Sequence, residues 1–134
     1  MRDRAALNLV VMEQCFEIIG RGDADGLVQH YTDDYVLELP FASADGGRRY
    51  EGRETVRARL QAVFRVLRLE ITLTEVHPCA DPDLVIAEYT SVGTSLPTGA
   101  RNANRYVGLW WFREGRVSRT REYFNPELWV ARKI

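Results

Sequence analysis

Three segments with helical spacing come first in this 134-residue chain, and four strand-like segments follow with only short turns between them. In the first group apolar residues recur three and four positions apart, whereas in the second they alternate with polar residues. Turns this short cannot carry the crossover that a parallel pair requires, so we expect the four strands to form an antiparallel sheet. The order predicts an α+β fold with three helices from the N-terminal half, and it argues against a dinucleotide-binding fold.

Capping and turn residues set the boundaries of these segments. Gly20 or Gly22 can end the first helix, and Asp23 can cap the second. We expect helices at 7–19, 24–31 and 52–67, and strands at 35–41, 67–77, 84–96, 101–112 and 116–124.

Length and charge exclude several other classes of protein. With 134 residues and 46% hydrophobic content, the chain fits one domain over residues 1–134 with one pocket at most. Its 18 basic and 19 acidic residues leave a net charge of −1, which provides no overall field for nucleic acid or an anionic membrane. Polar residues interrupt the apolar N-terminal stretch, which is typical of an amphipathic helix rather than a signal peptide or membrane span. We expect neither nucleic acid nor a membrane as a partner.

Residues that commonly bind metals or cofactors are sparse. Cys15 and Cys79 lie far apart, which indicates neither a disulfide framework nor a zinc site, so we expect a reduced, cytoplasmic protein. His30 and His77 have no partner at the spacing of metal ligands. The glycines fall in turns, and no serine lies in a nucleophile-elbow motif. We therefore expect no metal and no cofactor.

The last two strands, joined by Arg-Glu-Gly at 113–115, allow the neighbours of each side chain to be estimated. Pairing Phe112 with Arg116 across this turn puts Tyr106 opposite Glu122. Because side chains alternate along a strand, the positions divide into two faces. One face carries Asn104, Tyr106, Gly108, Trp110, Phe112, Ser118, Thr120, Glu122 and Phe124.

This first face has the composition of a pocket lining. It combines aromatic and small residues with single polar groups, and Glu122 is its one charged residue. The other face is apolar toward the turn and basic farther along, as on a surface that contacts water or another subunit. Its residues are Arg105, Val107, Leu109, Trp111, Val117, Arg119, Arg121 and Tyr123. Two alternatives remain for Glu122. Either it lines a cavity, or it is a surface residue that points to water or pairs with an arginine. An error of one residue in the assumed register would also exchange its neighbours.

The closing hairpin resembles that of a known family. Residues 104–126, "NRYVGLWWFREGRVSRTREYFNP", follow the pattern Asn-x-Tyr, a strand, Asp/Glu-Gly-Lys/Arg-Ile/Val, and Arg-Asp/Glu-aromatic-aromatic-Asn/Asp. This pattern resembles the SnoaL-like group of the nuclear-transport-factor-2-like, or ketosteroid-isomerase-like, superfamily. The segments "GDADGLVQHYTDDYVLELPF", "YEGRETVRARL" and "DPDLVIAEYTSVG" agree in order, so the resemblance covers nearly all of the chain. Among members, the chain most resembles the phenazine-biosynthesis A/B proteins.

The resemblance implies a barrel-like cone of curved antiparallel sheet that three helices close around one apolar pocket. In related members an acid on the closing strand faces this pocket and transfers protons, and the resemblance places that acid at Glu122. It also implies a homodimer through the outer face of the sheet, with Leu109 and Trp111 as contacts.

Other catalytic residues of the superfamily have no counterpart in this chain. The general-base aspartate of the steroid isomerases falls on Leu39, and their oxyanion tyrosine falls near Cys15. The arginine of the epoxide hydrolases is missing from the strand containing "AEYTSVG". Arg59 takes the place of a third-helix histidine of the phenazine proteins. The resemblance therefore leaves Glu122 as the one acid carried over.

A carboxyl group among aromatic side chains can work as a proton donor and acceptor. Burial raises its pKa from the reference value of about 4.3, and roughly 3 units would bring it to neutrality. We therefore expect Glu122 to serve a cofactor-free enzyme of secondary metabolism that isomerises, cyclises, dehydrates or condenses a small apolar or cyclic ligand, such as a polyketide. The alternative is a non-catalytic ligand-binding or dimerisation domain of the same fold. Expected substrate contacts are Tyr106, Asn104, Tyr31, Trp110, Phe124, Leu39, Phe41, Glu88 and Arg59.

Overall fold

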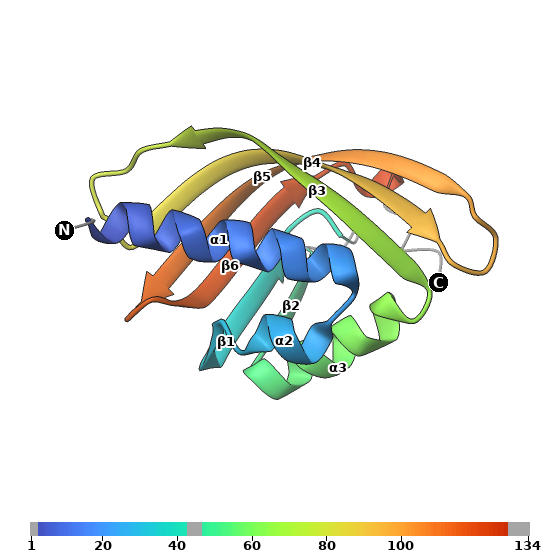
Figure 1. The fold of residues 1–134 in the computed structure, drawn as a ribbon, viewed down its shortest axis with the longest axis horizontal. Helices are drawn as coiled ribbons and strands as arrows, with labels where there is room; N and C mark the ends of the chain where they lie inside the picture. Colours follow the sequence, from blue (N-terminus) through green and yellow to red (C-terminus); the bar gives the residue numbers. More distant parts are fainter. Residues whose placement is uncertain (1–2, 43–46, 129–134) are drawn as a thin grey trace.

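The computed structural model describes residues 3–42 and 47–128. Its three helices lie on one face of a curved sheet, and the longest helix crosses the strands (Figure 1). The predicted α+β class is confirmed, because the helices belong to the N-terminal half and a four-strand segment follows them. The sheet curves around the helices without closing into a barrel, which corrects the barrel-like part of the expectation.

The sheet is mixed rather than fully antiparallel. Its strands are β1 (Tyr31–Leu39), β2 (Arg48–Glu51), β3 (Leu67–His77), β4 (Leu84–Ser95), β5 (Arg101–Arg113) and β6 (Arg116–Phe124), in the order β2-β1-β6-β5-β4-β3. The meander from β3 to β6 is antiparallel, as predicted. β1 instead pairs with β6 in parallel, because nearly the whole chain lies between these two strands and supplies the crossover. β2 was not predicted, since its four residues are mostly charged.

The first helix, α1 (Arg4–Arg21), has caps at both ends. The Asp3 carboxyl accepts a hydrogen bond from the Ala6 amide at 2.7 Å, which satisfies one of the free amides of the first turn. Gly22 follows the helix with a left-handed φ of 68°, so the second of the two predicted glycines ends it.

The other two helices are shorter than predicted. α2 (Ala24–Val28) ends before the expected residue 31, because Tyr31 begins β1 and pairs with Val117 of β6. α3 (Arg53–Phe64) also ends three residues before the expected residue 67, because Leu67 is the first residue of β3. In both cases pairing within the sheet prevails over helical spacing.

The apolar face of α1 packs into the concave side of the sheet. The ring of Phe16 lies 4.8 Å from the ring of Tyr89 and 5.4 Å from that of Trp110, measured between ring centres. Met12 and Cys15 are fully buried in the same cluster. This packing holds the inner side chains of β4 and β5 in place beside the cavity described below.

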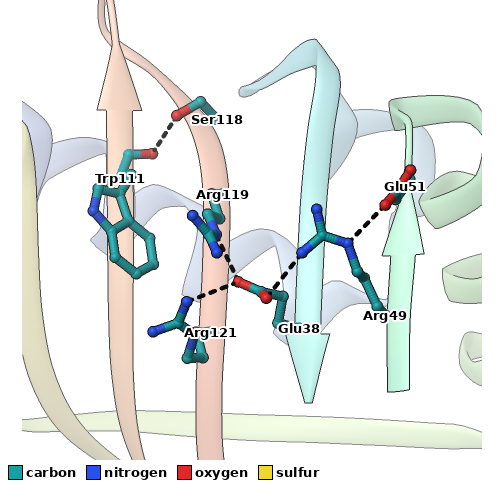
Figure 2. Close-up of polar contacts among 7 residues, drawn as sticks. All are labelled: Glu38, Arg49, Glu51, Trp111, Ser118, Arg119 and Arg121. Carbon is teal, nitrogen blue, oxygen red and sulfur yellow. Dashed lines mark hydrogen bonds and ion pairs between the residues drawn. The ribbon is translucent and has the colours of Figure 1, made fainter. Parts of the chain in front are cut away.

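The register of the last hairpin differs from the predicted one by one residue next to the turn and by two residues farther along. Its turn consists of two residues, Glu114 and Gly115, which both have positive φ (52° and 79°), so the strands begin to pair at Arg113 and Arg116. A bulge then follows at Ser118, whose hydroxyl donates to the Trp111 carbonyl at 3.2 Å (Figure 2). Together these features shift the predicted pairs without turning the strands over.

The shift changes the neighbours of Glu122 but not its face. Glu122 pairs with Gly108, and Tyr106 pairs with Phe124, so the predicted Tyr106–Glu122 pair is wrong. Between the turn and the bulge the register differs from the predicted one by one residue, so Val117 pairs with Phe112 and is fully buried, although we had expected it on the outer face. A shift of two residues preserves facing because side chains repeat with a period of two.

On the outer face of the sheet, Trp111 lies against two arginines (Figure 2). The guanidinium carbons of Arg119 and Arg121 lie 4.9 Å and 5.2 Å from its ring centre. Glu38 accepts hydrogen bonds from Arg119 at 2.6 Å and from Arg121 at 3.3 Å. On its other side Glu38 accepts from Arg49 at 2.9 Å. One carboxylate therefore joins β1, β2 and β6.

Candidate functional site

A cavity of about 130 Å³ lies between α3 and the inner face of the sheet. Most of its wall is aliphatic or aromatic. The lining residues are Ile19, Leu27, Tyr31, Tyr35, Leu37, Leu39, Tyr50, Val56, Arg59, Leu60, Val63, Phe64, Leu67, Leu69, Ile71, Tyr89, Tyr106, Trp110, Thr120, Glu122 and Phe124. An apolar wall with a few polar groups is the usual composition of a small-molecule site.

Glu122 is the one carboxylic acid in this lining, among the residues that the structure describes. It projects from β6, and its Oε2 atom accepts a hydrogen bond from the Tyr89 hydroxyl on β4. The indole Nε1–H of Trp110 donates in turn to the Tyr89 oxygen at 3.2 Å. The three groups form a chain of hydrogen bonds that ends at the carboxyl group and fixes its orientation.

The other carboxyl oxygen of Glu122, Oε1, makes no hydrogen bond to any residue in the ranges 3–42 and 47–128. Glu122 keeps part of its accessible surface because it faces the cavity. Burial raises the pKa of the Glu122 carboxyl, and the hydrogen bond from Tyr89 offsets part of this increase. One oxygen is therefore held by the protein, and the other is available to a ligand.

Tyr89 stays protonated in this arrangement. Burial, followed by the nearby Glu122 charge, raises the pKa of its hydroxyl well above the ordinary value. Tyr89 is 1% exposed and stacks on Tyr106, with ring centres 5.2 Å apart and planes 19° apart. It therefore acts as a fixed hydrogen-bond donor to the carboxyl group.

Tyr106 lines the cavity as expected, but it has a different partner. Its hydroxyl shares a hydrogen bond of 2.8 Å with the Ser91 hydroxyl instead of reaching Glu122. Burial raises the pKa of Tyr106 to about 12. This tyrosine therefore contributes a ring surface beside Tyr89.

A second polar position lies two residues before Glu122 on β6. The hydroxyl oxygen of Thr120 is buried without a hydrogen-bond partner in the described part of the chain. Thr120 lines the same cavity, next to the stacked rings of Tyr31 and Tyr35, whose centres are 3.9 Å apart. Buried polar groups are normally hydrogen-bonded, and the neighbour of this hydroxyl is Tyr35. Burial raises the pKa of Tyr35, and the Thr120 hydroxyl offsets part of this larger rise.

Seven of the ten residues predicted for the site line the cavity. They are Glu122, Tyr106, Tyr31, Trp110, Phe124, Leu39 and Arg59. Leu39 lines it where the steroid isomerases carry an aspartate, which leaves Glu122 without a second acid. Arg59, from α3, has its guanidinium carbon 5.9 Å from the ring centre of Tyr50, and both side chains are half-buried.

Asn104, Phe41 and Glu88 lie outside this lining. Asn104 exchanges two hydrogen bonds with the backbone of Asn125, at 3.0 Å and 3.2 Å, and so fixes the chain after β6. Phe41 is 54% exposed and packs against Tyr123. Glu88 alternates with the buried Ala87 and Tyr89 on β4, so it faces away from the cavity.

Glu88 instead contacts a histidine for which the sequence indicated no partner. Its Oε2 lies 2.6 Å from His77 Nε2, and this hydrogen bond raises the pKa of the imidazole. Glu75 lies nearby. One potential metal-ligand atom from each of Glu75, His77 and Glu88 lies within 4.8 Å of the other two. Cross-strand pairing of β3 with β4 brings them together, which spacing along the chain cannot show.

Tyr89 and Thr120 are the polar site residues that sequence reasoning missed. Tyr89 belongs to a stretch of β4 in which every second residue is buried, beginning with Val85 and Ala87. This alternation was the available signal for Tyr89. Thr120 had been assigned to the inner face but not to the ligand contacts.

With this geometry known, comparison with other proteins identifies the family. The model of the SnoaL-like domain matches residues 12–120, which is most of the chain. The chain belongs to the SnoaL-like family. An uncharacterised PhzA/B-like protein of Pseudomonas aeruginosa is 29% identical to this SnoaL-like chain over 116 residues, covering 87% of the chain and 82% of the relative.

Solved structures show the same fold. A proposed isomerase from Bacillus subtilis superimposes with a TM-score of 0.86 at 23% identity, covering 95% of this chain and 92% of that protein. A Mycobacterium tuberculosis protein in complex with estradiol-17beta-hemisuccinate gives a TM-score of 0.80 at 21% identity, covering 91% and 96% of the two chains. In the described residues of this SnoaL-like chain, no helix is long and apolar enough to cross a membrane.

Proposed function

We propose that this SnoaL-like chain acts as a single domain that catalyses a cofactor-free acid–base reaction on a small molecule of secondary metabolism. The reaction class is isomerisation, cyclisation, dehydration or condensation, with Glu122 as the proton donor and acceptor. The observation that carries the proposal is a carboxyl group in a mostly apolar cavity, with one oxygen that no residue in the described part of the chain hydrogen-bonds. Placing a carboxyl group there destabilises its charged form, a cost that a simple binding pocket would not require.

The surroundings of Glu122 suit both directions of proton transfer. Burial raises the pKa of its carboxyl and so favours the protonated form, which can donate a proton to a substrate oxygen. The hydrogen bond from Tyr89 supports the carboxylate, which can accept a proton from carbon or nitrogen. Glu122 thereby changes state while Tyr89 holds its orientation.

The remaining lining residues position the ligand. Tyr31, Trp110, Tyr106 and Phe124 offer ring surfaces, and Leu39 adds an aliphatic surface. Arg59 lies on α3 beside Tyr50 and adds a positive charge at that end of the cavity.

Hydrogen exchange of cyclic ketones tests the acid–base role without knowledge of the natural substrate. The chain is incubated in D₂O with a panel of small cyclic ketones, and deuteration of the carbon next to the carbonyl is followed by NMR. We expect exchange faster than in buffer, and its loss in Glu122→Gln. Glu88→Gln, which alters a carboxyl group outside the cavity, serves as the matched control. Exchange that survives in Glu122→Gln contradicts the proposal.

The second candidate is a non-catalytic ligand-binding domain. The apolar wall favours it, as does the Mycobacterium tuberculosis protein of the same fold, which holds a steroid derivative. Binding alone leaves no role for proton transfer at Glu122. Tight binding of a ketone without exchange above the buffer rate would favour this alternative.

We further propose a homodimer that assembles through the outer face of the sheet. Val107 is 40% exposed there and lies on the same face of β5 as the half-buried Leu109 and Trp111. A contiguous apolar stripe bordered by charged residues is typical of a protein contact. We assign the chain to the cytoplasm on its two free thiols, Cys15 and Cys79.

A further inference from the structure

We propose that the cavity selects a ligand with a single six-membered ring and a hydroxyl or carbonyl oxygen, and that it excludes four-ring steroids. This inference rests on the proposed function in one respect, because it takes the cavity that contains Glu122 as the substrate site. It goes beyond that proposal by assigning the size and polarity of the substrate.

The first argument is volume. The cavity measures about 130 Å³. An engineered protein cavity of about 150 Å³ takes up benzene, so this cavity accommodates about one ring of that size. A steroid has four fused rings and several times that volume. The cavity therefore has room for one ring of a ligand like that of the Mycobacterium tuberculosis protein and not for all four, although the fold is shared.

The second argument is the rigidity of the inner wall. Tyr31, Tyr35, Tyr89 and Trp110 are each at most 5% exposed and belong to the core cluster under α1. Tyr31 and Tyr35 are stacked face to face, with ring planes 15° apart. Moving any of these rings outward would open the core, and close-packed interiors resist such changes. Enlargement on this side is therefore costly.

The third argument is the position of the acidic group. One oxygen of Glu122 makes no hydrogen bond to the residues that the structure describes, and it faces the cavity near the rings of Tyr106 and Trp110. An oxygen of the ligand can meet this carboxyl group while the ring lies against Tyr106 or Trp110. A carboxylate at this end would meet the Glu122 carboxyl, which favours a hydroxyl or carbonyl.

Binding of phenol, toluene and estradiol tests the size limit and the need for an oxygen separately. Isothermal titration of the purified chain is expected to show saturable binding of phenol. Toluene, which lacks the oxygen, should bind about fivefold more weakly, the equivalent of one hydrogen bond. Estradiol should not bind. Estradiol affinity equal to or greater than that of phenol overturns the inference, and equal affinities for toluene and phenol overturn its polar part.

Filling the cavity shows whether phenol occupies it. Val63→Phe and Leu60→Phe each add a ring to the wall from α3, and both should weaken phenol binding at least about tenfold, because the added ring takes the volume of the ligand. Ala62→Phe places the same ring on the exposed side of the same helix and should leave binding unchanged. Phenol binding that survives in both folded filling variants overturns the inference.

Failure of this inference is distinguishable from failure of the proposed function. Phenol binding reports the size and polarity of the cavity, whereas ketone exchange reports proton transfer at Glu122. Selective phenol binding without any exchange of ketones would reject the acid–base function alone. Glu122-dependent exchange together with tight estradiol binding would reject the size limit alone.

Discussion

The hydroxyl group of Tyr89 reaches across β5 and donates a hydrogen bond to the carboxyl group of Glu122. The two residues belong to β4 and β6, which do not pair with each other. The reach is possible because β5 has a glycine, Gly108, at the position paired with Glu122. A Cβ atom at Gly108 would overlap the Tyr89 hydroxyl and lie 2.8 Å from two carbons of its ring. The candidate site therefore depends on the absence of one side chain.

Gly108→Ala is expected to displace Tyr89 and weaken its hydrogen bond to Glu122. The clash involves a ring that is 1% exposed, so we expect a loss of about 1–3 kcal/mol in the free energy of unfolding. Urea denaturation measures this loss. The double variant Gly108→Ala/Tyr89→Leu should recover part of it, because the smaller side chain leaves room for the methyl group. Equal losses with and without Tyr89→Leu would show that the clash lies elsewhere.

Tyr89→Phe is expected to raise the pKa of Glu122 further. It removes the hydrogen bond that lowers this pKa and leaves the burial that raises it. Titration of the ¹³C-labelled carboxyl carbon by NMR reports the change. Tyr106→Phe is the matched control, because its hydroxyl bonds to Ser91 and not to Glu122. An unchanged Glu122 titration in Tyr89→Phe would refute this role of the tyrosine.

Stability should fall as pH rises through the titration of Glu122. The pKa of this carboxyl in the folded chain lies above its ordinary value of 4.5, so between these two values the folded state binds more protons than the unfolded state. The free energy of unfolding then decreases with increasing pH over this window. Glu122→Gln removes the dependence, so its stability relative to the parent should increase from pH 4.5 upward. Denaturation at a series of pH values measures the difference, and a constant or decreasing difference contradicts the expectation.

Glu38→Gln should destabilise the contact between β1 and β6. The Glu38 side chain is 17% exposed and accepts hydrogen bonds from Arg49, Arg119 and Arg121, which lower the pKa of its carboxyl, Arg119 most strongly. We expect a loss of about 1–2 kcal/mol in the free energy of unfolding near neutral pH. Glu51→Gln is the control, since the Glu51 side chain is 68% exposed and contacts Arg49 at the edge strand. Its loss should stay below about 0.5 kcal/mol, and similar losses in both variants would contradict the argument.

Val107→Glu should convert the proposed homodimer to monomers. It places a charge in the middle of the apolar stripe formed with Leu109 and Trp111, where a dimer contact would bury it unpaired. Sedimentation velocity at micromolar concentration measures the change. Leu96→Glu, at another exposed apolar side chain, beside α3, should leave the dimer intact. A parent chain that sediments as a monomer rules out the dimer at once.

Facing within the final hairpin could be predicted from the sequence because alternation is a local property. The inward positions of Trp110, Thr120 and Glu122 follow from a period of two, which a register shift of two residues leaves unchanged. The pairs across the hairpin could not be predicted in the same way. They depend on whether Arg113 belongs to the turn or to the strand, and on a bulge at Ser118.

The composition of the site was only partly predictable for a related reason. Phe124 and Trp110 line the cavity because they share an inner face with Glu122. Asn104 shares that face but lies beyond the end of the cavity, where the backbone after β6 takes its amide. Asn104 differs from Phe124 and Trp110 in its position along the strand and not in its facing. Which positions line the cavity depends on where the helices cover the sheet.

The sequence by itself indicated the family and the order of helices and strands except β2, and with the family resemblance it favoured an inward facing for Glu122. These features depend on local spacing and on residue patterns that each segment carries within itself. Only the tertiary structure decided that Tyr89 is the partner of Glu122 and that β1 joins β6 in parallel. Both contacts join strands that lie far apart in the chain. The Tyr89–Glu122 contact also depends on the turn and the bulge that set the β5–β6 register, and on the missing side chain at Gly108.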